Sequence, residues 1–258
     1  MTLFISGKMQ INSVFLPKVS CICPTFGRAY LLEEAIESFL RQDYPGEKEL
    51  IICNDFVDQE LIYDHPEVKV INLPERAPNL GFKKNYTYEN ASGDLFLTWE
   101  DDDIHLPGRI SRMVKSIKEF NEDFVFEGPY YLLYGGRLSK KMEGKTSGTH
   151  IITRKLFYES GKIPAMNSGQ DQAFNTLLQK HVGKPLPTCT ESPQFLYRFS
   201  TGRAHISQFG KDAENKTSGY ELILDAVRQY VKQGKEPSGK YVLKPHWSKD
   251  WVEAVKDL

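Results

Sequence analysis

The sequence predicts an α/β domain built on a mostly parallel sheet flanked by helices, with a helical C-terminal appendage. From residue 18 to about residue 126, short apolar segments alternate with segments of helical periodicity, which is typical of βαβ units. The chain has 258 residues, of which 40% are hydrophobic, enough to bury one large core. An amphipathic segment at residues 219–232 predicts the main helix of the appendage.

The first half of the chain supplies the predicted sheet and its first helices. In the segment 29–42, six apolar side chains fall on one helical face, and the opposite face carries Glu33, Glu34 and Glu37. A strand at residues 19–23 is predicted to stop at Pro24. The other elements predicted here are strands at 49–53, 68–73 and 95–99, a helix at 81–90 and a helix that begins near Pro107.

Beyond residue 121 the pattern changes. A Gly/Lys-rich stretch, residues 135–148, predicts a mobile loop, and closure of this loop over a bound substrate is a hypothesis that rests on its composition alone. A turn at 236–239 precedes a short terminal helix. The remaining predicted elements are strands at 130–134, 150–152 and 194–198 and a helix at 171–181.

Composition narrows the class of protein. The formal net charge of −1 excludes a global positive field that would attract nucleic acid or an anionic membrane. The four cysteines form no CxxC pair, and three lie in apolar strand-like runs, so buried free thiols are predicted rather than zinc sites or disulfides. No apolar run approaches the length of a membrane span, and the N-terminus lacks the pattern of a signal peptide. A cytoplasmic protein without a transmembrane segment is therefore expected.

Four consecutive acidic residues, Glu100, Asp101, Asp102 and Asp103, directly follow the predicted strand at 95–99. The carboxyl end of a parallel strand is where ligands bind in open α/β sheets. Adjacent carboxylates repel one another, and a hard divalent cation held by oxygen ligands would relieve that repulsion. The alternative is a solvated acidic loop that interacts with the dipole of the next helix. The position after an apolar strand favours the metal.

Three other residues are candidates for the functional site, and each of them also has an ordinary structural explanation. Asp55 ends the second strand, where it can accept hydrogen bonds from a base or ribose, or cap the following turn. Asp171 opens a helix after a glycine-containing loop, a position where a carboxylate usually caps the helix. His205 has no distinguishing context, and a surface histidine is the default interpretation.

Four motifs, in this order along the chain, resemble the family 2 glycosyltransferases of GT-A fold. They are CPTFGR at 23–28, IICND at 51–55, NLGFKKN at 79–85 and EDDDIHLPGR at 100–109. The resemblance extends over residues 18–198 and implies a GT-A-type, Rossmann-like sheet. It also implies a nucleotide-sugar-binding half at 18–126, preceded by an N-terminal extension at 1–17. An acceptor-binding half of the same domain at 127–210 and a helical appendage at 211–258 complete the expected organisation.

The resemblance also implies roles for individual residues. Asp171 matches the catalytic base, although Gln170 replaces the glutamate that precedes this base in the family. Lys84 stands where the family often has arginine and is expected to approach the diphosphate. Glu100 departs from the aspartate of the family, so either Glu100 or Asp101 fills the first acidic position. The residues expected to bind the donor are Pro24, Thr25, Arg28, Asp55, Lys84, Glu100 and Asp101, and the residues expected to bind the metal are Asp102, Asp103 and His205.

The implied reaction is a metal-dependent transfer, with Mn²⁺ or Mg²⁺, of a sugar from a nucleoside diphosphate donor to an acceptor hydroxyl, with inversion. Uridine is the commonest base in the family. The acceptor is not specified by the sequence; a carbohydrate, another hydroxyl-bearing molecule and a nucleic acid all stay open. Two alternatives remain: a nucleotidyltransferase acting on sugar phosphates, disfavoured by the absence of a glycine-rich GxG run, and a non-catalytic module that binds nucleotide sugars.

Overall fold

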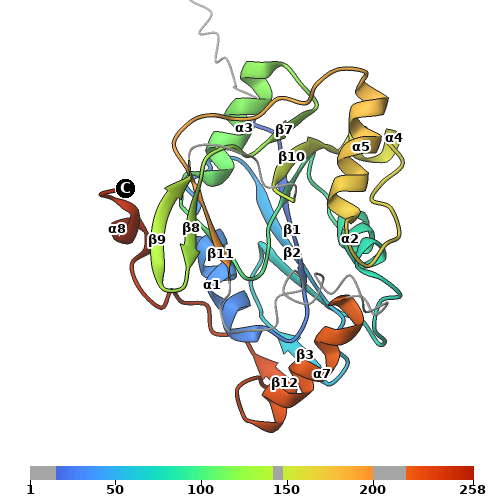
Figure 1. Cartoon of the computed structure of the whole chain (residues 1–258), viewed down its shortest axis with the longest axis vertical. Helices are drawn as coiled ribbons and strands as arrows, with labels where there is room; N and C mark the ends of the chain where they lie inside the picture. The colour runs from blue at the N-terminus through green and yellow to red at the C-terminus, as the bar shows by residue number, and fades with distance from the viewer. Residues whose placement is uncertain (1–15, 142–147, 200–218) are drawn as a thin grey trace, which may run out of the picture.

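A six-stranded sheet forms the centre of the computed structural model, which describes residues 16–141, 148–199 and 219–258 (Figure 1). The first four strands in the sheet run parallel, and the fifth is antiparallel to both of its neighbours. The predicted mostly parallel α/β fold is thereby confirmed. In spatial order the strands are β4 (Val68–Asn72), β2 (Lys48–Asn54), β1 (Val19–Thr25), β5 (Leu95–Thr98), β10 (His150–Thr153) and β7 (Phe124–Phe126).

Helices cover both faces of this sheet, so that the domain has three layers. On β1, Cys21 and Cys23 face one apolar cluster and Ile22 faces the other, as the alternation of a strand requires. Helices α1 (Ala29–Leu40) and α3 (Arg109–Phe120) pack on the first cluster. Helices α2 (Leu80–Glu89), α4 (Arg154–Glu159) and α5 (Gln170–Val182) pack on the second. The four cysteines are buried free thiols, as predicted.

Strand β1 continues through Pro24 to Thr25, two residues beyond its predicted end. The Trp99 backbone N–H donates to the Ile22 carbonyl, so the even-numbered residues of β1 direct their backbone groups toward β5. Pairing with β5 ends at Ile22. Pro24, which has no N–H, therefore lies where no ladder bond is required, and it is tolerated in a central strand.

A second sheet lies beside the first. Residues 137–141, predicted as part of a loop, form a strand instead, because Gly135 and Gly136 both have positive φ and close a two-residue hairpin turn. Residues 142–147 lie outside the described part of the chain. In spatial order the strands of this sheet are β6 (Ile104–His105), β11 (Phe195–Phe199), β8 (Tyr130–Tyr134) and β9 (Arg137–Lys141).

The C-terminal part of the chain packs against α1 and the end of β2. It contains the helices α7 (Gly219–Lys232) and α8 (Trp251–Val255) and also a strand, β12 (Gly239–Val242). Strand β12 pairs in parallel with β3 (Gln59–Ile62). The chain between β12 and α8 covers the predicted polar face of α1, so that Glu33 and Glu34 are buried.

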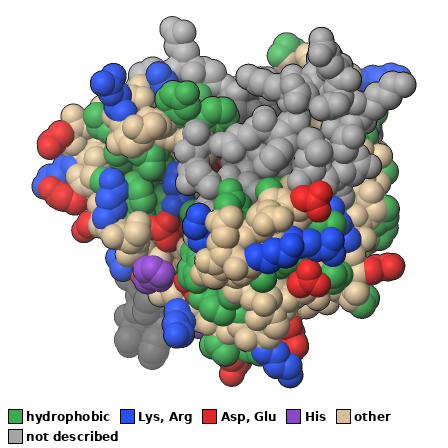
Figure 2. All heavy atoms as spheres, turned by 60° about the horizontal axis from the view of Figure 1, so that its bottom comes forward, with side chains coloured by type: hydrophobic (Ala, Val, Ile, Leu, Met, Phe, Trp, Pro, Cys, Tyr) green, Lys and Arg blue, Asp and Glu red, His purple; other side chains and the backbone are tan. Residues whose placement is uncertain are grey.

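The face that carries α7, β3 and β12 has no broad region of one charge over the part that is not grey. Figure 2 shows Lys and Arg side chains interleaved there with Asp and Glu side chains. This distribution agrees with the net charge of −1. Among the described residues, no helix has both the length and the apolar character that crossing a bilayer would require.

Candidate donor and catalytic site

The order of the strands reverses between β1 and β5. The chain proceeds from β1 outward to β2 and β4, and then returns to place β5 on the other side of β1. Ligands of open α/β sheets bind in the crevice at the carboxyl ends of the strands that flank such a point. The segments that leave β1 and β5 here carry Arg28 and the acidic turn, which we define as residues 100–103.

Arg28 joins two carboxylates of the acidic turn. Its Nη2 lies 2.5 Å from Asp101 Oδ1, and its Nη1 lies 2.5 Å from Asp102 Oδ2. Thr25 Oγ1 donates to Asp101 Oδ2 at 2.6 Å. Burial raises the pKa of Asp101 to about 6, with a further contribution from the Asp102 carboxylate, although Arg28 acts in the opposite direction. Arg28 thus offsets part of the negative charge that the turn buries.

Asp103 has its hydrogen-bond partner on β11. Its Oδ1 accepts the backbone N–H of Arg198 at 2.8 Å, and the Arg198 Nε donates to the carbonyl oxygen of Asp102. Burial raises the pKa of Asp103 well above its usual range, and the neighbouring Asp102 adds to this rise. The structure thus brings Asp101 and Asp102 together at Arg28 and directs Asp103 toward β11.

Asp55, which directly follows β2, has a buried carboxylate that contacts Lys83 and the backbone of Ala77. Lys83 Nζ lies 2.7 Å from Asp55 Oδ1, and the Ala77 backbone N–H donates to Asp55 Oδ2 at 3.2 Å. Lys83 also donates to the carbonyl oxygen of Thr25 at 3.0 Å. Lys83 was not among the residues expected from the sequence, because only the packing of α2 distinguishes it from Lys84. Binding of a base by Asp55 stays a prediction.

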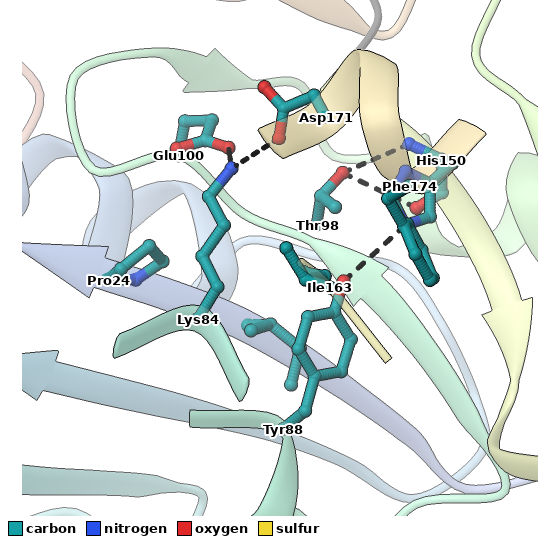
Figure 3. Close-up of a pocket in the computed structure, with 10 residues that line it drawn as sticks. Pro24, Lys84, Tyr88, Thr98, Glu100, His150, Ile163, Asp171 and Phe174 are labelled. Atoms are coloured by element: carbon teal, nitrogen blue, oxygen red, sulfur yellow. Dashed lines mark hydrogen bonds and ion pairs between the residues drawn. The ribbon is translucent and has the colours of Figure 1, made fainter. Parts of the chain in front are cut away.

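Lys84 connects the acidic turn to helix α5. Its Nζ lies 2.9 Å from Asp171 Oδ1 and 3.4 Å from Glu100 Oε1, and Figure 3 shows the ammonium between the two carboxylates. Burial alone would lower the pKa of Lys84, but Asp171 and Glu100 together raise it. Asp171 is therefore turned toward the edge of the sheet, and helix α5 has no side-chain cap from its N-cap residue, Gly169.

A small cavity lies below this ion pair. Its lining includes Pro24 and Tyr88 (Figure 3). The hydroxyl of Tyr88 lies 3.4 Å from His150 Nε2. Burial lowers the pKa of His150 to about 3, in spite of the nearby Asp171, so the imidazole is neutral at neutral pH. Lys84, not His150, is the cation that faces Asp171.

The segment Asn79–Asn85 has a physical role in placing α5. Asn79 caps helix α2 by accepting the Phe82 N–H at 2.8 Å. Asn85 exchanges two hydrogen bonds with the backbone of Ile163, at 2.7 and 3.0 Å. A Cβ on Gly81 would lie 2.0 Å from the carbonyl oxygen of Pro164. The glycine and the asparagine thus hold the loop that leads to Asp171 against α2.

The residues expected to bind a metal are only partly brought together. Within the described ranges, no group of three or more His, Cys, Asp or Glu side chains is arranged to hold an ion. Asp101 and Asp102 do supply carboxylate oxygens, which Mn²⁺ and Mg²⁺ prefer. His205 lies outside the described residues. The donor atoms of Asp101 and Asp102 fit a hard divalent cation in type, and Arg28 is the cation that contacts them in this structure.

The sequence matches a known family. The model of "Glycosyl transferase family 2" matches residues 20–179. The uncharacterized glycosyltransferase YwdF of Bacillus subtilis is 31% identical over 64% of this chain and 61% of its own length. The GalNAc(5)-diNAcBac-PP-undecaprenol beta-1,3-glucosyltransferase of Campylobacter jejuni is 33% identical over 50% of this chain and 43% of its own length. The chain thus spans less than two thirds of the length of either relative.

Solved structures share the fold. Staphylococcus aureus TarS 1–349, in complex with UDP-GlcNAc, superimposes with a TM-score of 0.60 at 19% identity, over 72% of this chain and 60% of that one. The mannosyltransferase PcManGT of Pyrobaculum calidifontis, in complex with GDP-Man and Mn²⁺, gives 0.51 at 17% identity, over 86% and 72%. Because the family model covers more than half of the residues, this chain belongs to glycosyl transferase family 2.

Proposed function

We propose that this chain transfers a glycosyl group from a UDP sugar to an acceptor hydroxyl, with inversion at the anomeric carbon and with the help of a divalent cation. Membership of the family supports the reaction class. A UDP donor is supported by the TarS structures, which contain UDP and UDP-GlcNAc. The acceptor binds in the half of the domain formed by residues 127–210.

One contact carries this proposal. Lys84 Nζ lies 2.9 Å from Asp171 and 3.4 Å from Glu100. The side chain of Lys84 therefore contacts both the proposed base, Asp171 on α5, and Glu100 of the proposed donor site after β5. A transferase needs this arrangement, because its base and its leaving group lie on either side of one anomeric carbon.

In the proposed reaction, Asp171 accepts the proton of the acceptor hydroxyl while the oxygen of that hydroxyl attacks the anomeric carbon. The bond between this carbon and the β-phosphate oxygen breaks, and nucleoside diphosphate leaves. Asp102 would hold Mn²⁺ or Mg²⁺, and such an ion would offset charge on the leaving group. Lys84 contributes a further positive charge on the side of the diphosphate, and Asp55 binds the uracil.

We assign the donor to the residues at the carboxyl end of β1 and to the carboxylates that they contact. Pro24 and Thr25 are the last two residues of β1 at the switch point, and Arg28 follows the strand. Arg28 and Thr25 hold Asp101, so we assign Asp101 to the ribose. Glu100 remains a candidate for the same contact, since its carboxylate is partly exposed beside Lys84.

The variant Asp171→Asn tests the proposal. Nucleoside diphosphate released from UDP sugars, with water as the acceptor, should fall about 10²- to 10⁴-fold when the general base is lost. Binding of UDP with Mn²⁺, measured as a rise in melting temperature, should persist, because the substitution leaves the donor pocket intact. The exposed neighbour Gln172 provides the control Gln172→Ala, which should leave both quantities unchanged.

The products separate the rival functions. Release of pyrophosphate from UTP and a sugar 1-phosphate, without release of UDP from UDP sugars, would identify a nucleotidyltransferase. Binding of UDP sugars without turnover, equal in the wild type and in Asp171→Asn, would indicate a module that only binds. A wild-type protein that no nucleoside diphosphate stabilises, with or without Mn²⁺, would refute the proposed function.

A further inference from the structure

Helix α1 contributes a buried carboxylate, Glu34, that connects two distant parts of the chain. Its Oε1 accepts the Ser248 N–H at 2.9 Å, the Ser248 hydroxyl at 2.7 Å and the Trp251 Nε1–H at 3.1 Å. Its Oε2 pairs with Nη1 of Arg198. Burial alone would raise the pKa of Glu34, but Arg198 and Ser248 lower it. Glu34 is therefore ionised, with each oxygen assigned to a different partner.

Arg198 connects Glu34 to the acidic turn. Its backbone N–H donates to Asp103 Oδ1 at 2.8 Å, and its Nε donates to the Asp102 carbonyl oxygen. The strand that carries it, β11, also pairs with β6, which follows the turn directly. Asp102 and Asp103, the second half of the acidic turn, are thus held by Arg198 and by the pairing of β11 with β6.

This attachment matters because the turn is electrostatically unfavourable. Four carboxylates follow one another, and Asp101, Asp102 and Asp103 are buried. Their mutual repulsion would move an unrestrained turn away from the geometry in which Asp101 and Asp102 meet Arg28. Residues that contact a donor diphosphate or a metal work only when the surrounding residues fix them to within about 0.5 Å.

We propose that Arg198 is a positioning residue for the donor site, and that the C-terminal segment 244–258 acts on the acidic turn through the contacts Ser248/Trp251–Glu34–Arg198. The assignment of the turn to donor binding rests on the function proposed above. The physical coupling does not, because it is defined by contacts within the chain. It gives this C-terminal segment a role in the site, although none of its residues contacts the acidic turn itself in the hydrogen bonds described.

Two adjacent glutamates provide a matched comparison. Glu33 is also buried on α1 and also binds the C-terminal segment, since its Oε1 accepts the Lys244 N–H at 2.8 Å and the Tyr241 hydroxyl at 3.0 Å. None of its described contacts reaches Arg198. Glu34→Gln and Glu33→Gln therefore each weaken the attachment of the C-terminal segment, and only Glu34→Gln weakens the hold on Arg198.

The first measurement is hydrogen exchange of the full-length variants without ligand, under conditions where both are folded. We expect peptides covering residues 99–105 to exchange about tenfold faster in Glu34→Gln than in the wild type, and at the wild-type rate in Glu33→Gln. The double variant Ser248→Ala/Trp251→Phe should accelerate the same peptides to a smaller extent. Equal exchange of residues 99–105 in the two glutamine variants would overturn the proposal.

The second measurement is the Kd for UDP in the presence of Mn²⁺. Outer groups that orient metal ligands typically change affinity about 10- to 100-fold, so Glu34→Gln should bind at least about tenfold more weakly while Glu33→Gln stays within about twofold of the wild type. Similar losses of UDP affinity in Glu34→Gln and Glu33→Gln would show that Glu34 has only a structural role. If the wild type binds no UDP, the proposed function fails, but the exchange comparison still decides the coupling.

Discussion

At the scale of single residues, Arg28 offsets part of the negative charge of the acidic turn. The guanidinium is buried between Asp101 and Asp102, with one N–H to each. Removing one partner of a buried ion pair leaves an uncompensated charge, which typically destabilises a protein by about 3–5 kcal/mol. Arg28 is thus the side chain whose loss should show whether a metal ion can occupy this position.

We expect Arg28→Met to lower the free energy of unfolding by about 3 kcal/mol or more. Mn²⁺ should recover part of this loss, because it binds the freed carboxylates in the folded state only. Urea denaturation with and without Mn²⁺ measures both effects. The exposed Arg41, paired with Glu37 on the surface, provides the control Arg41→Met, for which we expect a loss of about 1 kcal/mol or less. Destabilisation that Mn²⁺ leaves unchanged would argue against a cation site at Asp102.

At the scale of elements, the periodicity of the sequence predicted the principal strands and helices because each has a clear pattern of its own. Helix α1 shows which feature periodicity cannot predict. Its apolar face packs on the sheet as expected, but the polar face is buried by a segment more than 200 residues away. Periodicity describes one helix and carries no information on what covers it. The short strands β3, β6, β7 and β12 were not predicted for the same reason, since their partners define them.

Some residues of the site were predicted from the sequence and others were not, for the same reason. Asp101, Asp102 and Arg28 were expected at one edge of the sheet, and they meet there, because residues that follow neighbouring parallel strands must lie close together. Lys83 and Arg198 were not expected. Arg198 is 95 residues from Asp103 in the sequence, and the pairing of β11 with β6 brings it to the acidic turn.

The junction between α2 and the loop before α5 leads to a prediction at this scale. Gly→Ala within a helix normally stabilises a protein by about 1 kcal/mol. At Gly81 a Cβ would lie 2.0 Å from the Pro164 carbonyl oxygen, so we expect Gly81→Ala to destabilise the protein instead, by about 1–3 kcal/mol. The displaced loop should also reduce transfer more than UDP binding, since it leads to Asp171. A melting temperature of Gly81→Ala equal to or above that of the wild type would show that the loop is not fixed against α2.

At the scale of the whole molecule, helix α1 and the C-terminal part of the chain stabilise each other. Helix α1 begins after Arg28 without a side-chain cap from that residue. Glu236 supplies the missing acceptor, because its Oε1 accepts the Ala29 N–H at 2.8 Å and the Gln59 Nε2–H at 2.9 Å. A carboxylate at this position satisfies a free N–H group and interacts favourably with the helix dipole. The residue that caps α1 thus lies in the last quarter of the sequence.

We therefore expect Glu236→Ala to lower the free energy of unfolding by about 1–2 kcal/mol, the usual effect of losing a cap, with Glu236→Gln losing less. The contact joins the C-terminal part to the main sheet, so both should unfold together. Tryptophan fluorescence, which reports on Trp247 and Trp251 beside α1 as well as on Trp99 in the core, should follow the same urea transition as far-UV ellipticity. Two separate transitions in the wild type would mean that the C-terminal part is an independent unit, and its hold on Glu34 would then be too weak to position the acidic turn.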